Sequence, residues 1–457
     1  MKQIIKKGQY GVLLVIMACI IFLFGCQKEV TKSNSSESLE KANAESHGHL
    51  KQTNTFSSDV AIDWITMQMR LMRASGQGNT PLIRLYAYTG VALYESVVGG
   101  MPAFQSVASQ LNGLSGLPET QHGFAYHWPS TANAAMALIN KKLFPTASAA
   151  NQAAIDSLEN ALKAQYQDDA DAATIDRSIA FGKAVAQKVF DWSETDGKKQ
   201  HENDPYTPPP GEGLWVPTPP AFAAAATPYW VNLRTMVPGS GNNSQPGPPI
   251  AYSKDPSSDF YKMVKHVYDV SQHLSPQDSA QALFWRDAPG TVPAHYLNIL
   301  AQAIQKANST LDVAAYGWIL SGLASMDASI SCWIAKFHYN LVRPITYIRT
   351  VLGHPGWNAL FATPAHPEYP SAHATITSAY GDAMTAVFGD NFSLTDHTYD
   401  FLGMAPRTFS SFVALGEDGG NSRLFAGIHY QPSIDTGFTV GRTVAQNIIK
   451  GVKFLKE

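Results

Sequence analysis

Residues 309–344 read STLDVAAYGWILSGLASMDASISCWIAKFHYNLVRP, and this stretch decides the fold. From Ala314 to Ile330 its apolar residues recur every three to four positions, which is the spacing of one long helix. Ser309 and Asp312 stand at the two ends of a pattern typical of a capping box, which would open this helix. Pro344 disfavours helical dihedrals at the residue before it, so the helix is expected to run past Lys336 and to end near Val342.

The same periodicity extends outward along the chain, and few segments alternate in the way of a strand. The predicted fold is therefore all-α, a single large helical-bundle domain with a long Pro-rich loop. Further helices are expected from Asp59 to Leu71 and near 82–98, 131–142, 148–166, 171–194, 257–272, 276–286, 290–307 and 374–387.

Composition excludes several classes of protein. The 457 residues are 45% hydrophobic, which is ample for a buried core and excludes wholesale disorder. With 15% charged residues and a net charge of −3, nothing favours nucleic acid as a partner. Three cysteines cannot form a disulfide framework.

The N-terminus predicts export and a lipid anchor. A lysine-containing start is followed by 13 apolar residues, Val12 to Phe24, which are too few for a comfortable membrane span. The run ends in Leu-Phe-Gly-Cys and resembles a bacterial lipobox, so residues 1–25 are expected to be a lipoprotein signal peptide and Cys26 the lipidated residue. The alternative is an uncleaved signal anchor.

Two further segments differ in composition from the helical parts. Residues 26–57 are rich in Ser, Lys, Glu and Asn and predict a flexible tether before a helical domain at 58–457. In residues 204–256, twelve prolines fall between Pro205 and Pro249, and they disfavour a long helix. This segment is interpreted as a long loop packed within the domain through Trp215, Phe222, Tyr229 and Trp230; a linker between two domains is the alternative.

A first candidate motif pairs two cations. Lys336 and Arg343 are seven residues apart, two turns of the predicted helix, and are expected on the same side of it. Two like charges on one face repel each other unless an anion lies between them. Alone, such a pair more often forms a solvated basic face, but aromatic neighbours such as Trp333 favour a partly buried site.

A second motif, from His366 to His373, leads into an apolar helical pattern. Ser371 stands where an N-cap belongs, directly after a proline. The N-terminus of a helix presents free N–H groups and the positive end of a dipole, which suits an anion. His373 in the first turn would lie beside that anion and transfer protons, unless this is an ordinary capped helix with a surface histidine.

A third motif comprises Ser422, Arg423, Gly427 and His429. Arginine offers a planar fork to oxyanions, and histidine offers a nucleophilic or metal-ligating nitrogen. Gly427 would let the chain turn and bring both side chains to one point, although an ordinary loop is plausible for this motif alone.

Together the motifs supply three cations, a helix N-terminus with a hydroxyl, and two histidines, which suits an oxyanion better than a divalent cation. The order Lys-x6-Arg-Pro, Pro-Ser-Ala-His, Ser-Arg-x5-His resembles the signature shared by vanadium-dependent haloperoxidases and type 2 phosphatidic acid phosphatases. Upstream residues, including Trp285-Arg286-Asp287 and the Pro-rich loop, resemble bacterial haloperoxidase homologues, and the resemblance covers about residues 60–450.

The resemblance implies a role for each residue of the motifs. Lys336, Arg343 and Arg423 would neutralise the oxygens of bound vanadate. Ser371 and the backbone N–H of Ala372 would donate to other oxygens, His429 would be the axial ligand to vanadium, and His373 the acid–base histidine. Phosphate can occupy the same site.

The chain departs from the family pattern at two positions. Ala372 replaces the usual glycine, so its methyl group narrows the pocket and affects halide range. The aspartate that often follows the ligand histidine by four residues is replaced by Ser433, and Asp435 comes only at six. The group that orients His429 is therefore left open, and Asp287 is suggested as a partner of Arg423.

His366 occupies a position that is often Phe in chloroperoxidases and His in bromoperoxidases. By that resemblance it favours bromide or iodide as the halide; a structural histidine beside Pro367 is the alternative.

The implied activity is oxidation of halide by hydrogen peroxide to hypohalous acid through a peroxovanadate, followed by transfer to an organic acceptor. The alternatives are an acid phosphatase that forms a phosphohistidine at His429, since phosphate and vanadate are nearly isosteric, and a non-enzymatic lipid-anchored binding protein. The expected location is the bacterial cell envelope, at the outer membrane if Gram-negative, because Gln27 follows Cys26. Membrane contact is expected through the anchor only, and a homo-oligomer is compatible with the sequence.

Overall fold

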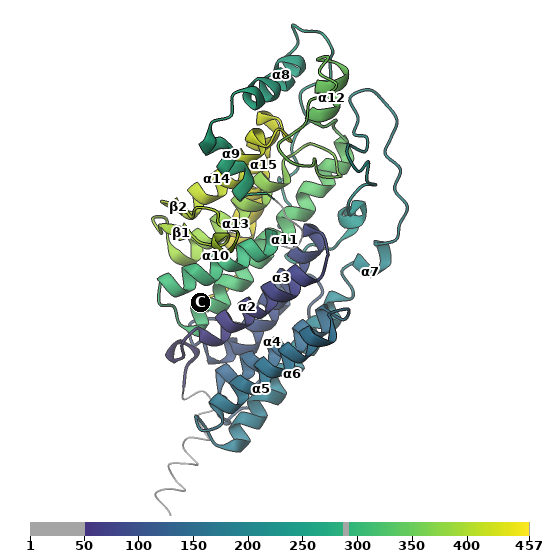
Figure 1. The fold of residues 1–457 in the computed structure, drawn as a ribbon. Helices are drawn as coiled ribbons and strands as arrows, with labels where there is room; N and C mark the ends of the chain where they lie inside the picture. Colours follow the sequence, from purple (N-terminus) through teal and green to yellow (C-terminus); the bar gives the residue numbers. More distant parts are fainter. Residues whose placement is uncertain (1–50, 287–291, 457) are drawn as a thin grey trace, which may run out of the picture. The chain divides into compact units, whose positions relative to one another are not determined.

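The computed structural model describes residues 51–286 and 292–456. The predicted signal peptide, Cys26, most of the tether and Asp287 lie outside these ranges. The regular secondary structure of the described chain is helical apart from one short antiparallel pair, β1 (Leu394–Asp396) with β2 (Arg407–Phe409). The all-α prediction is confirmed, and this hairpin is the part that it missed (Figure 1).

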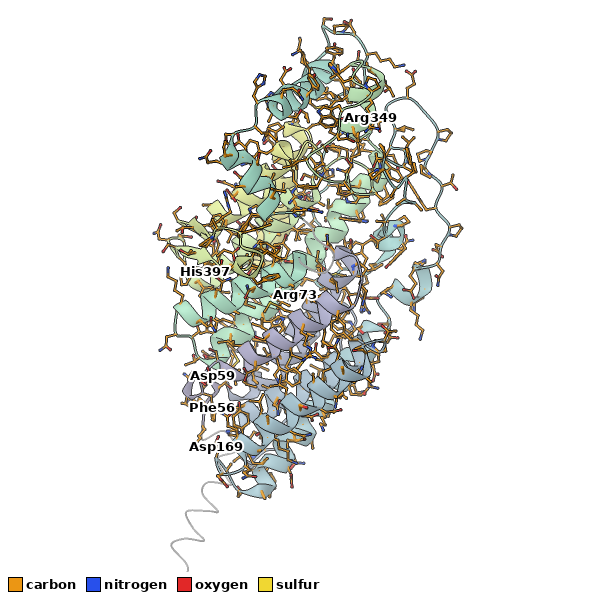
Figure 2. All side chains as sticks on the ribbon, viewed as in Figure 1. Phe56, Asp59, Arg73, Asp169, Arg349 and His397 are labelled. Atoms are coloured by element: carbon orange, nitrogen blue, oxygen red, sulfur yellow. The ribbon has the colours of Figure 1, made fainter. Side chains whose placement is uncertain are left out.

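The α-helices are, in chain order, α2 (Asp59–Ala74), α3 (Asn79–Val97), α4 (Trp128–Leu143), α5 (Ala149–Tyr166), α6 (Ala172–Ser193), α7 (Lys198–His201), α8 (Asp259–Gln272), α9 (Pro276–Phe284), α10 (Val292–Lys306), α11 (Leu311–Tyr339), α12 (Pro344–Thr350), α13 (Ala372–Phe388), α14 (Phe412–Phe425) and α15 (Gln431–Gly451). Helices α2 to α6 form one group, and α11, α13, α14 and α15 form another. The two groups meet where α3 packs along α11 (Figure 1). Side chains from both groups fill one continuous hydrophobic core (Figure 2).

Helix α11 is the central element, and it is buried along almost its whole length. It is apolar and long enough to cross a membrane, but 94% of the relevant window is enclosed by the rest of the protein. A helix that is apolar all round is a core helix when other helices surround it.

Both ends of α11 differ from the sequence-based expectation. Its N-cap is Thr310, which makes no side-chain cap hydrogen bond, so the predicted capping box is wrong; the Thr310 hydroxyl donates to Asp312 Oδ1 instead, at 2.5 Å. The helix ends at Tyr339 because Asn340 adopts a left-handed conformation with φ of 48°. Arg343 is therefore not in α11 but is the N-cap residue of α12, and the prediction that Lys336 and Arg343 share one helical face is wrong.

The Pro-rich segment 204–256 lies against α11. Asp327 of α11, which is fully buried, accepts the backbone N–H groups of Met236 at 2.6 Å and Val237 at 3.0 Å. Trp230 is fully buried and donates from Nε1 to Ser329 Oγ at 2.9 Å. Phe222 is 64% exposed, so it does not anchor the segment as expected.

Two glycines of α15 bring that helix into contact with the start of α13. A Cβ on Gly437 would lie 2.7 Å from the Ser371 carbonyl oxygen, and one on Gly441 would lie 2.0 Å from that of Thr375. Only a residue without a Cβ permits this approach. The close packing of α13 on α15 places the first turn of α13 next to the loop that joins α14 and α15.

Candidate functional site

The three sequence motifs meet around one cavity of about 460 Å³. Lys336 comes from the last turn of α11, Arg343 from the start of α12, and Ser371 to His373 from the start of α13. Arg423 comes from the last turn of α14, and His429 from the loop before α15. The cavity is lined by His366, Ala372, His373, Arg423, His429, and by mainly apolar residues that include Trp333, Phe361, Ile376 and Ile428.

Lys336 and Arg343 are fully buried just behind this lining. Lys336 Nζ donates to the carbonyl oxygens of Pro367 and Glu368, both at 2.8 Å. Arg343 donates from Nε to His366 O at 2.8 Å and from Nη1 to Ile428 O at 2.9 Å. Within the described ranges neither cation forms a salt bridge with a carboxylate, so carbonyl groups fix both cations without neutralising them.

Burial of these cations changes their acid–base behaviour. Loss of hydration lowers the pKa of Lys336 to about 7, and repulsion from Arg343 adds to this effect. Loss of hydration also lowers the pKa of Arg343 to about 10, and repulsion from Arg423 adds to it. A bound anion would offset both effects, since it stabilises the charged forms.

Arg423 reaches the cavity from the opposite side. Its Nε donates to Ser422 Oγ at 3.1 Å, its Nη2 donates to Trp285 O, and its guanidinium lies 5.6 Å from the centre of the Phe361 ring. A third cation is thus held at the cavity wall, and the exposed Arg286 also borders the cavity.

The start of α13 has the predicted geometry. Ser371 is the N-cap residue, and its hydroxyl oxygen accepts from Ala374 N at 3.5 Å. Its backbone N–H donates to Ser433 O at 2.9 Å. Ala372 is the first helical residue and lines the cavity with His373, where the N–H groups of a first turn have no partner within the helix.

The chain turns at Gly427, which has φ of +75°, as the sequence predicts. A Cβ there would meet the Trp357 ring at 3.1 Å. This turn directs His429 back to the cavity four residues after α14 ends at Phe425.

His429 is buried between a cation and an anion. Its Nε2 lies 3.1 Å from Arg343 Nη1, and its Nδ1 lies 2.7 Å from Glu368 Oε1. Loss of hydration, reinforced by Arg343 and Lys336, lowers its pKa well below the ordinary value of 6.5, so the ring is neutral. A neutral imidazole is the form that ligates metals.

Glu368 is the residue of the site that the sequence interpretation missed. It is fully buried, and it was quoted only as part of the stretch from His366 to His373. Two features of the sequence could have indicated its role. Glu368 is an acidic residue in a mainly apolar segment between the motifs that carry the cations, and no aspartate stands four residues after His429 to accept from that histidine. Asp435, the acid considered there, is exposed and accepts from Gln431 Nε2 at 2.8 Å.

His366 is positioned by Arg343. Its Nδ1 lies 3.0 Å from Arg343 Nη2, and its ring lies 5.0 Å from that of Trp333. The same Nδ1 lies 3.2 Å from the Pro367 carbonyl oxygen, so it faces a donor and an acceptor at once. Trp333 Nε1 is buried without a hydrogen-bond partner in the described structure. An indole N–H donor thus lies on the Trp333–His366 side of the cavity.

Comparisons with known proteins show which family and fold this chain resembles. Residues 318–456 match the family described as "VCPO second helical-bundle domain". No curated protein matches the chain.

Three solved structures resemble most of the chain. The structure described as that of the first bacterial vanadium-dependent iodoperoxidase has 30% sequence identity and a TM-score of 0.81, and the match covers 88% of this chain and 98% of that one. The holo form of a bacterial vanadium-dependent chloroperoxidase has 16% identity, a TM-score of 0.61, and coverage of 83% and 94%. Its apo form has 17% identity, a TM-score of 0.62, and coverage of 82% and 95%. At this lower identity the two chloroperoxidase structures speak for the fold alone.

Proposed function

The chain belongs to the vanadium-dependent haloperoxidase family, and we propose that it uses vanadate to oxidise a halide with hydrogen peroxide, which yields hypohalous acid. One observation carries the proposal. Nε2 of a neutral, buried histidine, His429, lies at a cavity whose surroundings hold three buried cations and the N-terminus of a helix.

The donor set fits a tetrahedral or trigonal-bipyramidal oxyanion. Lys336, Arg343 and Arg423 would neutralise its oxygens, the Ser371 hydroxyl and Ala372 N–H would donate to others, and His429 Nε2 would ligate the metal. A divalent cation would need several carboxylates or thiolates, and no group of three or more His, Cys, Asp or Glu suited to a metal is found among the described residues.

When bound, vanadate supplies a Lewis-acidic centre that polarises the O–O bond of hydrogen peroxide. The chain contributes fixed positive charge, which favours negative charge that develops on oxygen in a cavity shielded from water. His373 lines the cavity in the first turn of α13 and is placed to accept a proton from hydrogen peroxide. The mainly apolar lining around Phe361 and Ile376 limits the access of bulk water.

Bromide or iodide is the proposed halide. Trp333 Nε1–H has no partner among the described residues, and it is a donor that a large, weakly hydrated anion could accept from. The relative with 30% identity is described as an iodoperoxidase, which also favours the larger halides.

We also propose that the enzyme is lipid-anchored at the cell envelope through Cys26. The support is the lysine-rich start, the 13-residue apolar run and the lipobox-like end of the signal. Labelling of cells with a radioactive fatty acid should mark the wild-type protein and not a Cys26→Ala variant; equal labelling of both would contradict the anchor.

The activity is tested on the purified protein with hydrogen peroxide, each halide and a phenolic acceptor, with and without orthovanadate. Halogenation should require vanadate and should disappear in His429→Ala. Asp435→Ala is the matched control, because this exposed acid is close in sequence but does not contact His429. Absence of halogenation with every halide, together with hydrolysis of a phosphomonoester that vanadate inhibits, would instead identify a phosphatase.

A further inference from the structure

Glu368 connects the histidine of the site to the elements that surround it. Its Oε1 accepts from His429 Nδ1 at 2.7 Å and from Tyr430 N at 3.0 Å. Its Oε2 accepts from Ser433 Oγ at 2.6 Å. The side chain is fully buried, so these three donors replace the hydration that the carboxylate loses.

The contacts on the two ring nitrogens of His429 determine where its proton lies. Arg343 has only N–H donors, so at 3.1 Å His429 Nε2 must be the acceptor. The carboxylate oxygen of Glu368 is an acceptor, so Nδ1 carries the proton and donates it. In this tautomer Nε2 is the unprotonated ring nitrogen, and its lone pair accepts from Arg343 Nη1 while His429 lines the cavity.

We propose that Glu368 is the positioning residue of His429, which fixes the Nδ1–H tautomer and the ring orientation and so keeps Nε2 available as the ligand atom. A carboxylate that accepts from the non-ligating nitrogen of a histidine also makes the ligating nitrogen more basic. The assignment of the ligand as vanadate rests on the proposed function; the assignment of the tautomer does not.

Ser433 extends this arrangement to the anion-binding turn. Its hydroxyl donates to Glu368, and its carbonyl oxygen accepts from the backbone N–H of Ser371 at 2.9 Å. Ser433 stands four residues after His429, and it thus holds the Glu368 carboxylate in place beside that histidine.

The tautomer is tested first, without any vanadate. Nitrogen-15 NMR of histidine-labelled wild-type protein, with the His429 signals assigned by comparison with His429→Ala, should show a protonated Nδ1 and an unprotonated Nε2. In Glu368→Leu, which removes the acceptor, the Nδ1–H should lose its hydrogen bond and its proton signal should move upfield. An unprotonated Nδ1 in the wild-type protein would overturn the proposal.

The effect on the ligand is tested by titration with orthovanadate, followed by vanadium-51 NMR. Glu368→Gln retains an acceptor for His429 but removes the charge, and should weaken vanadate binding by about 10- to 100-fold. Ser433→Ala should weaken it less. Asp327→Asn is the control, since it neutralises another fully buried acid on α11 that accepts from backbone N–H groups of the Pro-rich segment.

Vanadate binding by Glu368→Gln equal to that of the wild type, or an equal loss in Asp327→Asn, would overturn the positioning role. If the wild-type protein binds no vanadate, the proposed function fails, and the NMR tautomer still decides the role of Glu368. The two failures are therefore distinguishable.

Discussion

Replacement of Gly437 by alanine should push α15 away from the start of α13 and thereby damage the site at a distance from its chemistry. The added Cβ would lie 2.7 Å from Ser371 O and 2.8 Å from Ala374 Cβ, whereas ordinary contacts begin at 3.4 Å. The shortest contact must lengthen by the difference between 2.7 and 3.4 Å, about 0.7 Å, and its partner is backbone that cannot rotate away.

Two terms of opposite sign determine the stability of this variant. Overpacking of this kind costs about 1–3 kcal/mol. Alanine in a helix interior is about 1 kcal/mol more favourable than glycine. The net loss of stability is therefore small, about 0–2 kcal/mol, and the variant should fold. The functional loss should be larger, because Ser371 and the Ser433 contact move, and a displacement approaching 1 Å can reduce rate by about 10²-fold.

The assay combines thermal unfolding, vanadate titration and halogenation rate. Gly451→Ala is the matched control: it lies at the end of the same helix, and an added Cβ there meets nothing within 4 Å. Gly437→Ala should lose vanadate affinity and rate while Gly451→Ala retains both. Wild-type affinity in Gly437→Ala would refute the argument that this helix contact positions the site.

Three further outcomes are expected. Burial lowers the pKa of Lys336 from 10.5 to about 7, so between these pH values the unfolded chain binds more protons than the folded one. The free energy of unfolding of the anion-free protein should therefore increase as pH rises from about 7 toward 10. Urea unfolding of Lys336→Met should show a smaller increase, and an increase equal to that of the wild type would contradict this prediction. Orthovanadate at one hundred times its Kd should raise the free energy of unfolding by about 2.7 kcal/mol in calorimetry, and should not do so in His429→Ala. Ala372→Gly, which retains the N–H but removes a methyl group from the cavity wall, should raise kcat/KM for iodide relative to bromide; the opposite change would show that the methyl group does not limit halide size.

The sequence predicts the parts of the fold that depend on local chemistry. The expected helices at 148–166 and 171–194 correspond to α5 and α6 within one or two residues, since both begin with a capping side chain, Ser148 and Asp171. The N-cap role of Ser371 and the turn at Gly427 are likewise properties of a few adjacent residues. Patterns that involve only a few adjacent residues can be interpreted without knowledge of the tertiary structure.

The end of α11 shows where local reasoning fails. Pro344 indicated a helix end near Val342, but Asn340 ends the helix earlier by adopting a left-handed conformation. Its carbonyl oxygen accepts from Trp215 N at 2.6 Å, and Tyr206 donates to its side chain at 2.5 Å. Partners more than 120 residues away in the Pro-rich segment favour that conformation, and no pattern around Asn340 encodes them.

Glu368 was missed for a related reason. Its side-chain hydrogen-bond partners, His429 and Ser433, are 61 and 65 residues away in sequence. A glutamate in an apolar stretch can be a solvated loop residue or a buried one, and only the packing of α13 on α15 distinguishes the two. The cations and histidines were predictable as a set because each belongs to a compact motif.

The buried charges explain why this site needs so many backbone partners. The site contains three buried basic side chains, those of Lys336, Arg343 and Arg423. The buried carboxylate of Glu368 can balance the charge of only one of them. That excess disfavours the folded state without an anion, as the lowered pKa of Lys336 indicates. Hydrophobic packing along α11 must offset the cost, and the bound oxyanion recovers part of it. The same excess of positive charge would therefore favour binding of the proposed vanadate, while Glu368 lies on the Nδ1 side of His429.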